Sequence, residues 1–273
     1  MPEKKKKNIE TPITEKKYPS LVLGLDISTA CIGASIVFDD GINKPEIIKL
    51  THIVPKIDKN IKGIEALILR KQIFEEEFLM KIKDMKITEC VIESPLNFAT
   101  GNSNAVTVAQ LLQFNGLLSE AVYRVLGIVP NYVSSFDARM ISFPELLSIR
   151  KFNKKGVEYP LSHIKKAINE NHLTLFGSYP FDCDKKTVMM NLVNDMFSDL
   201  NWVYDKKGNL KKENFDACDS LVCVLAYINE KKHGVMNPFI KNHTITETEE
   251  KVIIEYVMDV WGTEYPKKIV LEK

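Results

Sequence analysis

The sequence lacks any apolar run close to the ~18 residues that a membrane-spanning helix requires. Residues Met1 to Lys7 carry lysines, but no apolar stretch follows them, so the pattern of a secretory signal is missing as well. We therefore expect no membrane segment, and a location in the cytoplasm or another intracellular compartment.

Cysteine is scarce, with 5 residues in a chain of 273. Their number is odd, and their spacing matches neither a zinc site nor a disulfide framework. We expect reduced thiols that serve as packing residues. These cysteines are Cys31, Cys90, Cys183, Cys218 and Cys223.

Two common kinds of catalytic signal are also missing. The sequence has no glycine-rich phosphate-binding loop of the Walker type. The 5 histidines are dispersed, so neither His163 nor His172 stands out as a catalytic base. We find no internal repeat.

What is present is the composition of a soluble globular protein, with 45% hydrophobic and 27% charged residues. Residues 1–18 are rich in lysine and poor in apolar residues, which predicts a flexible basic arm. We expect an α/β domain over residues 19–233 with a basic insertion at about 143–180, followed by a C-terminal extension over residues 234–273. The net charge is only +1, but basic residues gather at 139–186 and the chain from Gly234 is mildly acidic, so we expect a basic surface offset by acidic residues elsewhere.

Hydrophobic patterning predicts the order of the secondary structure. Short segments rich in β-branched residues and bounded by turn formers indicate strands at 21–28, 32–38, 47–54, 89–93 and 128–133. Apolar residues at a helical period indicate helices at 62–83, 105–126, 185–200 and 215–230. The stretch 252–257 fits either a strand or a helix. This order predicts an α/β fold with a mixed sheet, three antiparallel strands plus parallel strands, flanked by helices on both faces.

Two acidic residues occupy unusual positions in predicted strands. Asp26 lies within the apolar segment Gly24-Leu25-Asp26-Ile27-Ser28, and Glu93 ends the apolar segment Cys90-Val91-Ile92. Burying an ionised carboxylate is costly unless its charge is compensated. Metal coordination is one efficient compensation, although a lone acid in a strand is more often structural.

A second pair of acids lies near the start of a predicted helix. Asp216 and Asp219 are three residues apart, so they share one helix face. Together with Asp26 and Glu93 they would form an oxygen-rich cage suited to Mg²⁺, with Mn²⁺ as a substitute. Two-metal phosphodiester hydrolysis uses such a cage, which predicts two ions per site and Asp26 as the carboxylate between them.

These motifs resemble those of the RuvC-type Holliday junction resolvases of the RNase H-like superfamily. Gly24-Leu25-Asp26-Ile27-Ser28 with Gly33 is similar to the family's first strand and turn, and Val91-Ile92-Glu93 to its second acidic strand. The helix over 105–126 resembles the one that follows. Lys185-Lys186-Thr187-Val188 is similar to the family's Lys-x-x-Val helix start, and Asp216-Ala217-Cys218-Asp219-Ser220-Leu221 to its closing acidic motif.

The resemblance implies an RNase H-like fold and a homodimer that cuts four-way junctions, and possibly other branched DNA, by paired symmetric nicks. It implies that Asp26, Glu93, Asp216 and Asp219 hold the metal ions and that Lys185 assists near the scissile phosphate. Leu96 stands where the family has a stacking aromatic residue, which leaves Phe98 for that role.

DNA binding requires basic residues that neutralise phosphates. Where the family has a lysine before the variable region, this sequence has Ser142, so Arg139 is the nearest candidate. The complete set of predicted DNA-binding residues is Phe98, Asn104, Arg139, Lys151, Lys154, Lys155, Lys165, Lys166 and Lys186.

Two other functions remain open from the residues alone. The segment from Asp26 to Gly33 also fits the first hairpin of ATPases of the sugar kinase, actin and Hsp70-like class, but those proteins need a second similar domain. The other alternative is a junction-binding protein on the same fold that does not cut. Retention of all four carboxylates favours catalysis.

Overall fold

A computed structural model describes the chain over residues 18–95, 105–150, 152–153, 155–175, 183–198 and 200–273. The predicted basic arm, residues 1–18, lies outside these ranges apart from Tyr18.

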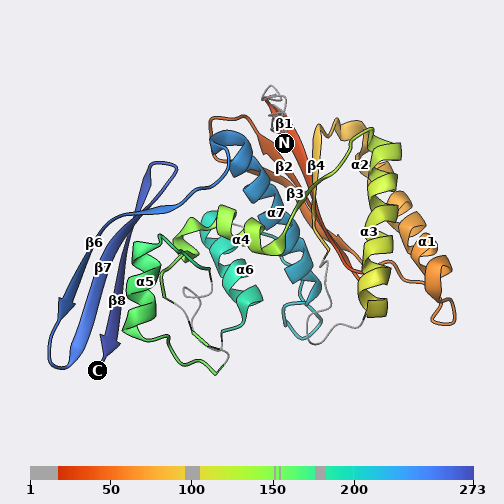
Figure 1. Cartoon of the computed structure of the whole chain (residues 1–273). Coiled ribbons are helices and arrows are strands. Elements are labelled where there is room, and N and C mark those ends of the chain that lie inside the picture. The colour runs from red at the N-terminus through yellow and green to blue at the C-terminus, as the bar shows by residue number, and fades with distance from the viewer. Residues whose placement is uncertain (1–17, 96–104, 151, 154, 176–182, 199) are drawn as a thin grey trace, which may run out of the picture.

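The central element is a five-stranded mixed sheet with the strand order β3-β2-β1-β4-β5 (Figure 1). Strands β1, β2 and β3 pair antiparallel, whereas β4 pairs parallel with β1 and β5 pairs parallel with β4. This confirms the predicted RNase H-like arrangement of three antiparallel strands plus parallel strands. The strands are β1 (Ser20–Ile27), β2 (Ile32–Asp39), β3 (Glu46–Ile53), β4 (Glu89–Glu93) and β5 (Asn131–Val133).

Helices cover both faces of this sheet (Figure 1). One face carries α1 (Gly63–Phe74) and α3 (Ala105–Leu126), and α1 continues through a π turn (Glu75–Leu79), α2 (Met80–Ile82) and a 3-10 turn (Lys83–Met85). The other face carries α7 (Glu213–His233), against which α4 (Ser135–Ser142) and α6 (Lys185–Met196) pack. The core is therefore divided into two layers, one on each side of the sheet.

Strand β1 alternates between these two layers. Leu23 and Leu25 pack into the layer beneath α1 and α3, whereas Val22 packs into the layer beneath α7. Successive side chains of a strand point to opposite faces. Asp26, four residues after Val22, therefore lies on the α7 face of the sheet.

Two glycines allow α7 to lie unusually close to the sheet. A Cβ atom at Gly33 would lie 1.9 Å from the backbone oxygen of Asp216. A Cβ atom at Gly24 would lie 2.4 Å from the backbone oxygen of Ser220. No side chain other than hydrogen fits at these positions, so β1 and β2 contact the first turns of α7 through their backbones.

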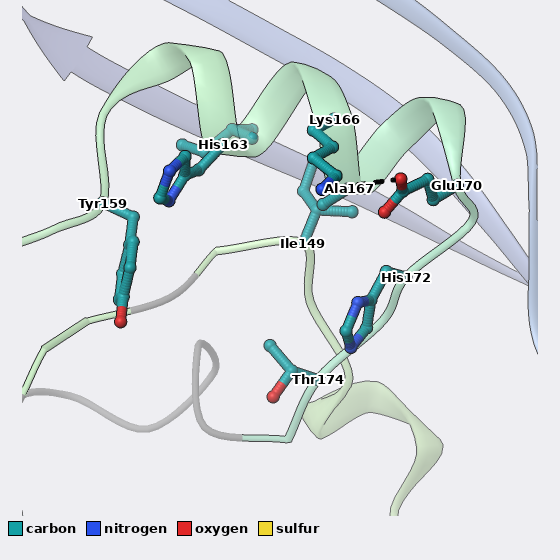
Figure 2. Close-up of a pocket in the computed structure, with 9 residues that line it drawn as sticks. Ile149, Tyr159, His163, Lys166, Ala167, Glu170, His172 and Thr174 are labelled. Carbon is teal, nitrogen blue, oxygen red and sulfur yellow. Dashed lines mark ion pairs between the residues drawn. The ribbon is translucent and has the colours of Figure 1, made fainter.

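The region after β5, which includes the predicted basic insertion, forms regular secondary structure. It contains α4, a short 3-10 turn (Pro144–Leu146) and α5 (Leu161–Asn169), and Figure 2 shows α5 in front of strands of a second sheet. This sheet is antiparallel, in the order β6-β7-β8, with β6 (Phe239–Glu247), β7 (Lys251–Val260) and β8 (Thr263–Glu272). The ambiguous stretch 252–257 is thus part of a strand.

The second sheet and the insertion share a small core. Ile149, Ile164 and Ile168 pack against Ile254 and Ile269 of the sheet. The end of β7 also reaches the main core, where Met258 and Val260 are buried. Residues 143–175 and 234–273, which are far apart in the sequence, are therefore packed together.

Two predicted elements extended several residues beyond the observed ones. The strand expected at 128–133 begins only at Asn131, because Pro130 has no N–H group to donate to a ladder. The helix expected to reach residue 200 ends at Met196, because Phe197 turns to an extended backbone and packs its ring into the core.

All five cysteines carry free thiols, as predicted, and only Cys183 is not buried. Within the described residues, no helix combines the length and the apolar character needed to cross a bilayer.

Candidate metal centre

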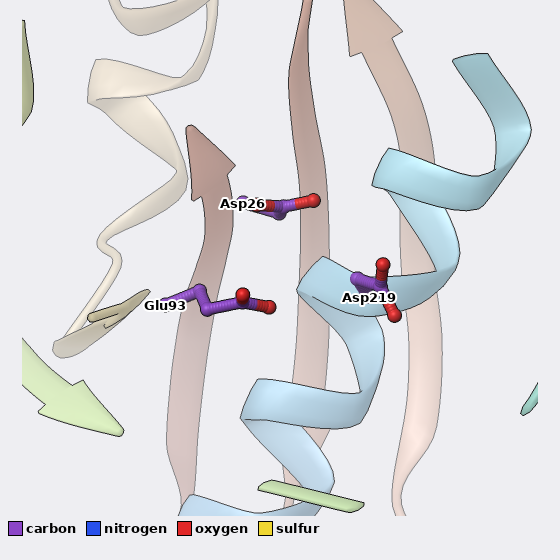
Figure 3. A group of neighbouring side chains, drawn as sticks. All are labelled: Asp26, Glu93 and Asp219. Carbon is purple, nitrogen blue, oxygen red and sulfur yellow. The ribbon is translucent and has the colours of Figure 1, made fainter. Parts of the chain in front are cut away.

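Three carboxylates from distant parts of the chain meet above the middle of the sheet. One oxygen each from Asp26, Glu93 and Asp219 lies within 4.8 Å of the other two. Figure 3 shows Asp26 and Glu93 on neighbouring strands, with their side chains on the side where α7 carries Asp219. Asp26 and Glu93 are partly buried, and Asp219 is buried.

Local structure explains why these acids meet. Leu25 and Ile92 are register partners in the parallel pair of β1 and β4, so Asp26 and Glu93 follow them at the same level of the sheet. Both side chains point to the α7 face, as those of Val22 and Val91 do. The close approach of α7 over Gly24 and Gly33 then brings Asp219 within reach of both.

Asp216 lies beside this group rather than within it. It is located one turn earlier on α7, and its carboxylate is joined to the group through Lys186. The Nζ atom of Lys186 lies 3.7 Å from Asp216 Oδ1 and 3.8 Å from Asp219 Oδ2. The four acids that the sequence analysis selected are thus gathered at one location, with three of them in closest contact.

Two cationic side chains border the acids. The guanidinium of Arg139 on α4 lies 3.6 Å from Asp219 Oδ1, and Lys186 on α6 approaches from another side. The ammonium of Lys186 also lies 5.8 Å from the centre of the Phe215 ring. Both cations come from helices that pack against α7, the helix that carries Asp216 and Asp219.

The pKa values of all three grouped carboxyls are raised. For Asp26, burial raises the pKa most, and the neighbouring charge of Glu93 raises it further. Burial and then the charge of Asp219 raise the pKa of Glu93 to about 7. For Asp219, burial raises the pKa, while the adjacent charges of Arg139 and Lys186 partly lower it.

The residues fit a divalent cation. Among the described residues, Arg139 and Lys186 form ion pairs with Asp216 and Asp219, and none of these ion pairs reaches Asp26 or Glu93. The donor atoms are all oxygens, the donors that Mg²⁺ and Mn²⁺ prefer. A divalent ion would offset both the burial and the mutual repulsion that raise these pKa values.

Cation binding should therefore depend on pH. A carboxyl must lose its proton to coordinate a metal, and in the protein without metal the pKa of Glu93 is about 7. We expect Mn²⁺ to bind more tightly at pH 8 than at pH 6, as measured by calorimetric titration. Equal affinity at the two pH values would contradict this coordination by Glu93.

The structure distributes the other predicted site residues over several locations. Lys185 begins α6, directly after Asp184, whose side chain caps the helix by accepting from the backbone N–H of Lys186. Lys155, Lys165 and Lys166 are exposed in the insertion. The predicted residues Phe98, Asn104, Lys151 and Lys154 lie outside the described residues.

Sequence reasoning missed the direct contacts between cations and acids. Arg139 and Lys186 were selected as DNA-binding residues, but each also forms an ion pair with Asp219. Nothing local in the doubled lysine at 185 and 186 reveals the ion pairs of Lys186 with Asp216 and Asp219.

Comparison with known proteins gives matches in structure but none in sequence. No protein-family model and no curated protein sequence matches this chain. Thermus thermophilus RuvC is 13% identical, with a TM-score of 0.45, over 78% of this chain and 96% of that chain. The same protein in complex with a Holliday junction substrate is 13% identical, with a TM-score of 0.45, over 79% of this chain and 97% of that chain.

A third match is the yeast mitochondrial Holliday junction resolvase Ydc2, which is 11% identical with a TM-score of 0.43, over 78% of this chain and 80% of that chain. The solved structures to which this chain is similar thus include a RuvC protein and a mitochondrial Holliday junction resolvase.

Proposed function

We propose that this protein is a metal-dependent endonuclease that cuts branched DNA, with four-way junctions as its principal substrate. The observation that carries the proposal is the group of Asp26, Glu93 and Asp219, whose oxygens lie within 4.8 Å of one another. The choice of branched DNA rests on the resemblance of the sequence motifs to those of the RuvC-type resolvases.

Asp26, Glu93 and Asp219, with Asp216 beside them, are the residues that would hold Mg²⁺ or Mn²⁺. Such ions, two per site, would supply an activated water and stabilise the departing 3′ oxygen. Asp26 is our choice for the carboxylate shared by two ions, because it projects from the central strand of the sheet.

The neighbouring cations have a separate role in the proposal. Arg139 and Lys186 pair with the carboxylates of Asp216 and Asp219 at 3.6 to 3.8 Å. At these distances a bound phosphate could compete with the carboxylates for the two cations. In the complex with DNA these side chains would contact the scissile phosphate and neutralise its charge. Lys185, the first residue of α6, would assist from the same helix end.

The remaining parts of the proposal concern the bound DNA and the assembly. The exposed residues Lys155, Lys165 and Lys166 would contact backbone phosphates of the duplex arms, with Lys151 and Lys154 of the same insertion. A homodimer would place two sites on one junction, as paired symmetric nicks require. Phe98 and Asn104 would contact the DNA close to the branch.

The ATPase alternative requires a second domain like the first. Among the described residues outside the central sheet, the largest strand assembly is the antiparallel sheet of β6, β7 and β8. It has no parallel strands, and it packs on α5 rather than facing the acids. This arrangement favours the nuclease over the ATPase.

The deciding experiment is incubation with a synthetic immobile four-way junction and a matched linear duplex, with and without Mg²⁺. We expect symmetric nicks on the junction only, and only when Mg²⁺ is present. ATP turnover without cutting would support the ATPase instead, and binding without cutting in Mg²⁺ would support a silent junction binder.

Junction binding should also depend strongly on salt. If about six lysine or arginine side chains contact phosphates, the affinity should fall by roughly 1000-fold between 50 and 200 mM salt, because each contact releases a counterion. The measurement is a titration of labelled junction in EDTA at several salt concentrations. An affinity that barely changes would show that the basic insertion does not contact the backbone.

A further inference from the structure

A second concave site lies outside the acidic centre, on the insertion. Figure 2 shows a pocket between α5 and the segment that follows it, with the side chains of Tyr159, His163 and His172 around it. Its volume is about 290 Å³, which is at the lower end of the range of small-ligand sites. It has room for a single planar ring system rather than for a large ligand.

The floor of the pocket is apolar and firmly held. Ile149 and Ile164 line it and are almost completely buried. The backbone N–H of Ile149 donates to the hydroxyl of Tyr256 at 3.2 Å, and that hydroxyl lies 3.2 Å from Ser148 Oγ. Because Tyr256 belongs to β7, the C-terminal sheet fixes the floor of a pocket whose walls come from the insertion.

The walls of the pocket present flat rings. Tyr159 and His163 stack with their ring centres 5.1 Å apart and their planes 28° from parallel. His172 stands on the opposite side of the pocket, with Thr174 near it (Figure 2). Rings on two sides of an apolar floor favour a flat aromatic ligand, because stacking buries both of its faces.

The rim of the pocket carries the ion pair of Lys166 with Glu170, and further lysines lie beside it. Lys166 lines the pocket, and its side chain is 69% exposed although it lies 3.7 Å from Glu170. Lys165, the preceding residue of α5, is exposed, and so is Lys155 in the loop before the helix. A ligand that is flat, aromatic and attached to a negative group matches both the walls and the rim.

We propose that this pocket binds an unpaired nucleobase of a DNA strand, with the base between Tyr159 and His172 and the adjoining phosphate at Lys166. The choice of a strand over a free nucleotide rests on the proposed function, because branched DNA offers unpaired bases beside the duplex arms. The pocket thereby gives the insertion a base-dependent contact in addition to its phosphate contacts.

The test compares two labelled 12-residue oligonucleotides, oligothymidylate and an abasic strand of the same length, by fluorescence anisotropy in EDTA. The wild-type chain should bind the strand with bases about 10-fold more tightly, a gain in keeping with base stacking on an aromatic ring. Tyr159→Ala and His172→Ala should each remove most of this preference without changing the affinity for the abasic strand.

The matched control is Tyr123→Ala, which removes an exposed ring of α3 on the other face of the sheet and should leave the preference unchanged. His172 is itself exposed, so its truncation tests the pocket even if Tyr159→Ala fails to fold. Equal wild-type binding of the two strands, or a preference that survives in the pocket variants, would overturn the proposal.

A third measurement distinguishes a base within a DNA strand from the base of a free nucleotide. Thymidine monophosphate at micromolar concentration should not displace the oligonucleotide, and displacement at that concentration would identify a free nucleotide as the ligand and overturn the assignment to a strand. Junction cutting in Mg²⁺ is measured on the same preparations. Base preference without cutting would refute only the nuclease, and cutting without base preference would refute only the pocket.

Discussion

A chain with Asp26→Asn is expected to bind a four-way junction as tightly as the wild type and to leave it uncut. The amide keeps the shape of the side chain but removes the negative charge that a divalent cation needs. Loss of a partner that merely orients a metal ligand costs about 10- to 100-fold in metal affinity or activity. Loss of a ligand itself should therefore reduce cutting by more than roughly 100-fold.

The same substitution should stabilise the protein when no metal is bound. The pKa of Asp26 is raised by burial and by the charge of Glu93, so the ionised carboxylate opposes folding at neutral pH. An amide removes this unfavourable charge. In EDTA at pH 8 the melting temperature of Asp26→Asn should exceed that of the wild type, and in Mg²⁺ the order should reverse or the difference should shrink.

Asp84→Asn is the matched control, because Asp84 is an exposed acid in the turn before β4. It should change neither cutting nor the response of the melting temperature to Mg²⁺. Asp219→Asn should behave like Asp26→Asn in the cleavage assay. Undiminished cutting by either site variant would refute the metal centre.

The second large effect is expected at Gly33, which contains no ionisable group and lies on the neighbouring strand. In Gly33→Ala the new methyl group would meet the backbone oxygen of Asp216 at 1.9 Å, so α7 must move away from the sheet. Such overpacking costs roughly 3 kcal/mol. The melting temperature should fall by roughly 6–12 °C in a chain of this size.

Gly33→Ala should also impair catalysis more than its stability suggests. The displaced helix carries Asp219 away from Asp26 and Glu93, so cutting should drop strongly even at temperatures where the variant is folded. Gly116→Ala provides the control, because Gly116 lies on α3 with nothing within 4 Å of an added Cβ atom. It should be neutral or stabilise by roughly 0.5–1 kcal/mol. Normal melting and cutting by Gly33→Ala would show that the spacing of α7 does not depend on this glycine.

The sheet and its acids could be predicted because their signals are local. An acid inside an apolar strand, as at Asp26, is unusual enough to be noticed in one sequence, and Asp216 and Asp219 share a helix face by simple spacing. The strand order follows from the short connections between β1, β2 and β3 and the helical crossovers after them. These features depend on neighbours along the chain.

Other features could not be predicted because they depend on distant parts of the chain. The pairing of Arg139 with Asp219 joins α4 to α7, and no local pattern announces it. Strand β6 is mostly exposed and polar, so it lacks the alternation that marks a strand with one buried face. Helix α5 is short and begins after Pro160 without a side-chain cap, which left its start without the usual signal.

The core shared by the insertion and the C-terminal sheet has a consequence for how this chain can be shortened. Ending the chain after Gly234 would expose Ile149 and Ile164 to solvent and would also remove Met258 and Val260 from the main core. Deleting the insertion alone would leave the buried face of β7 facing water. Removing either segment would therefore expose apolar residues of the other, although about sixty residues of chain separate the two.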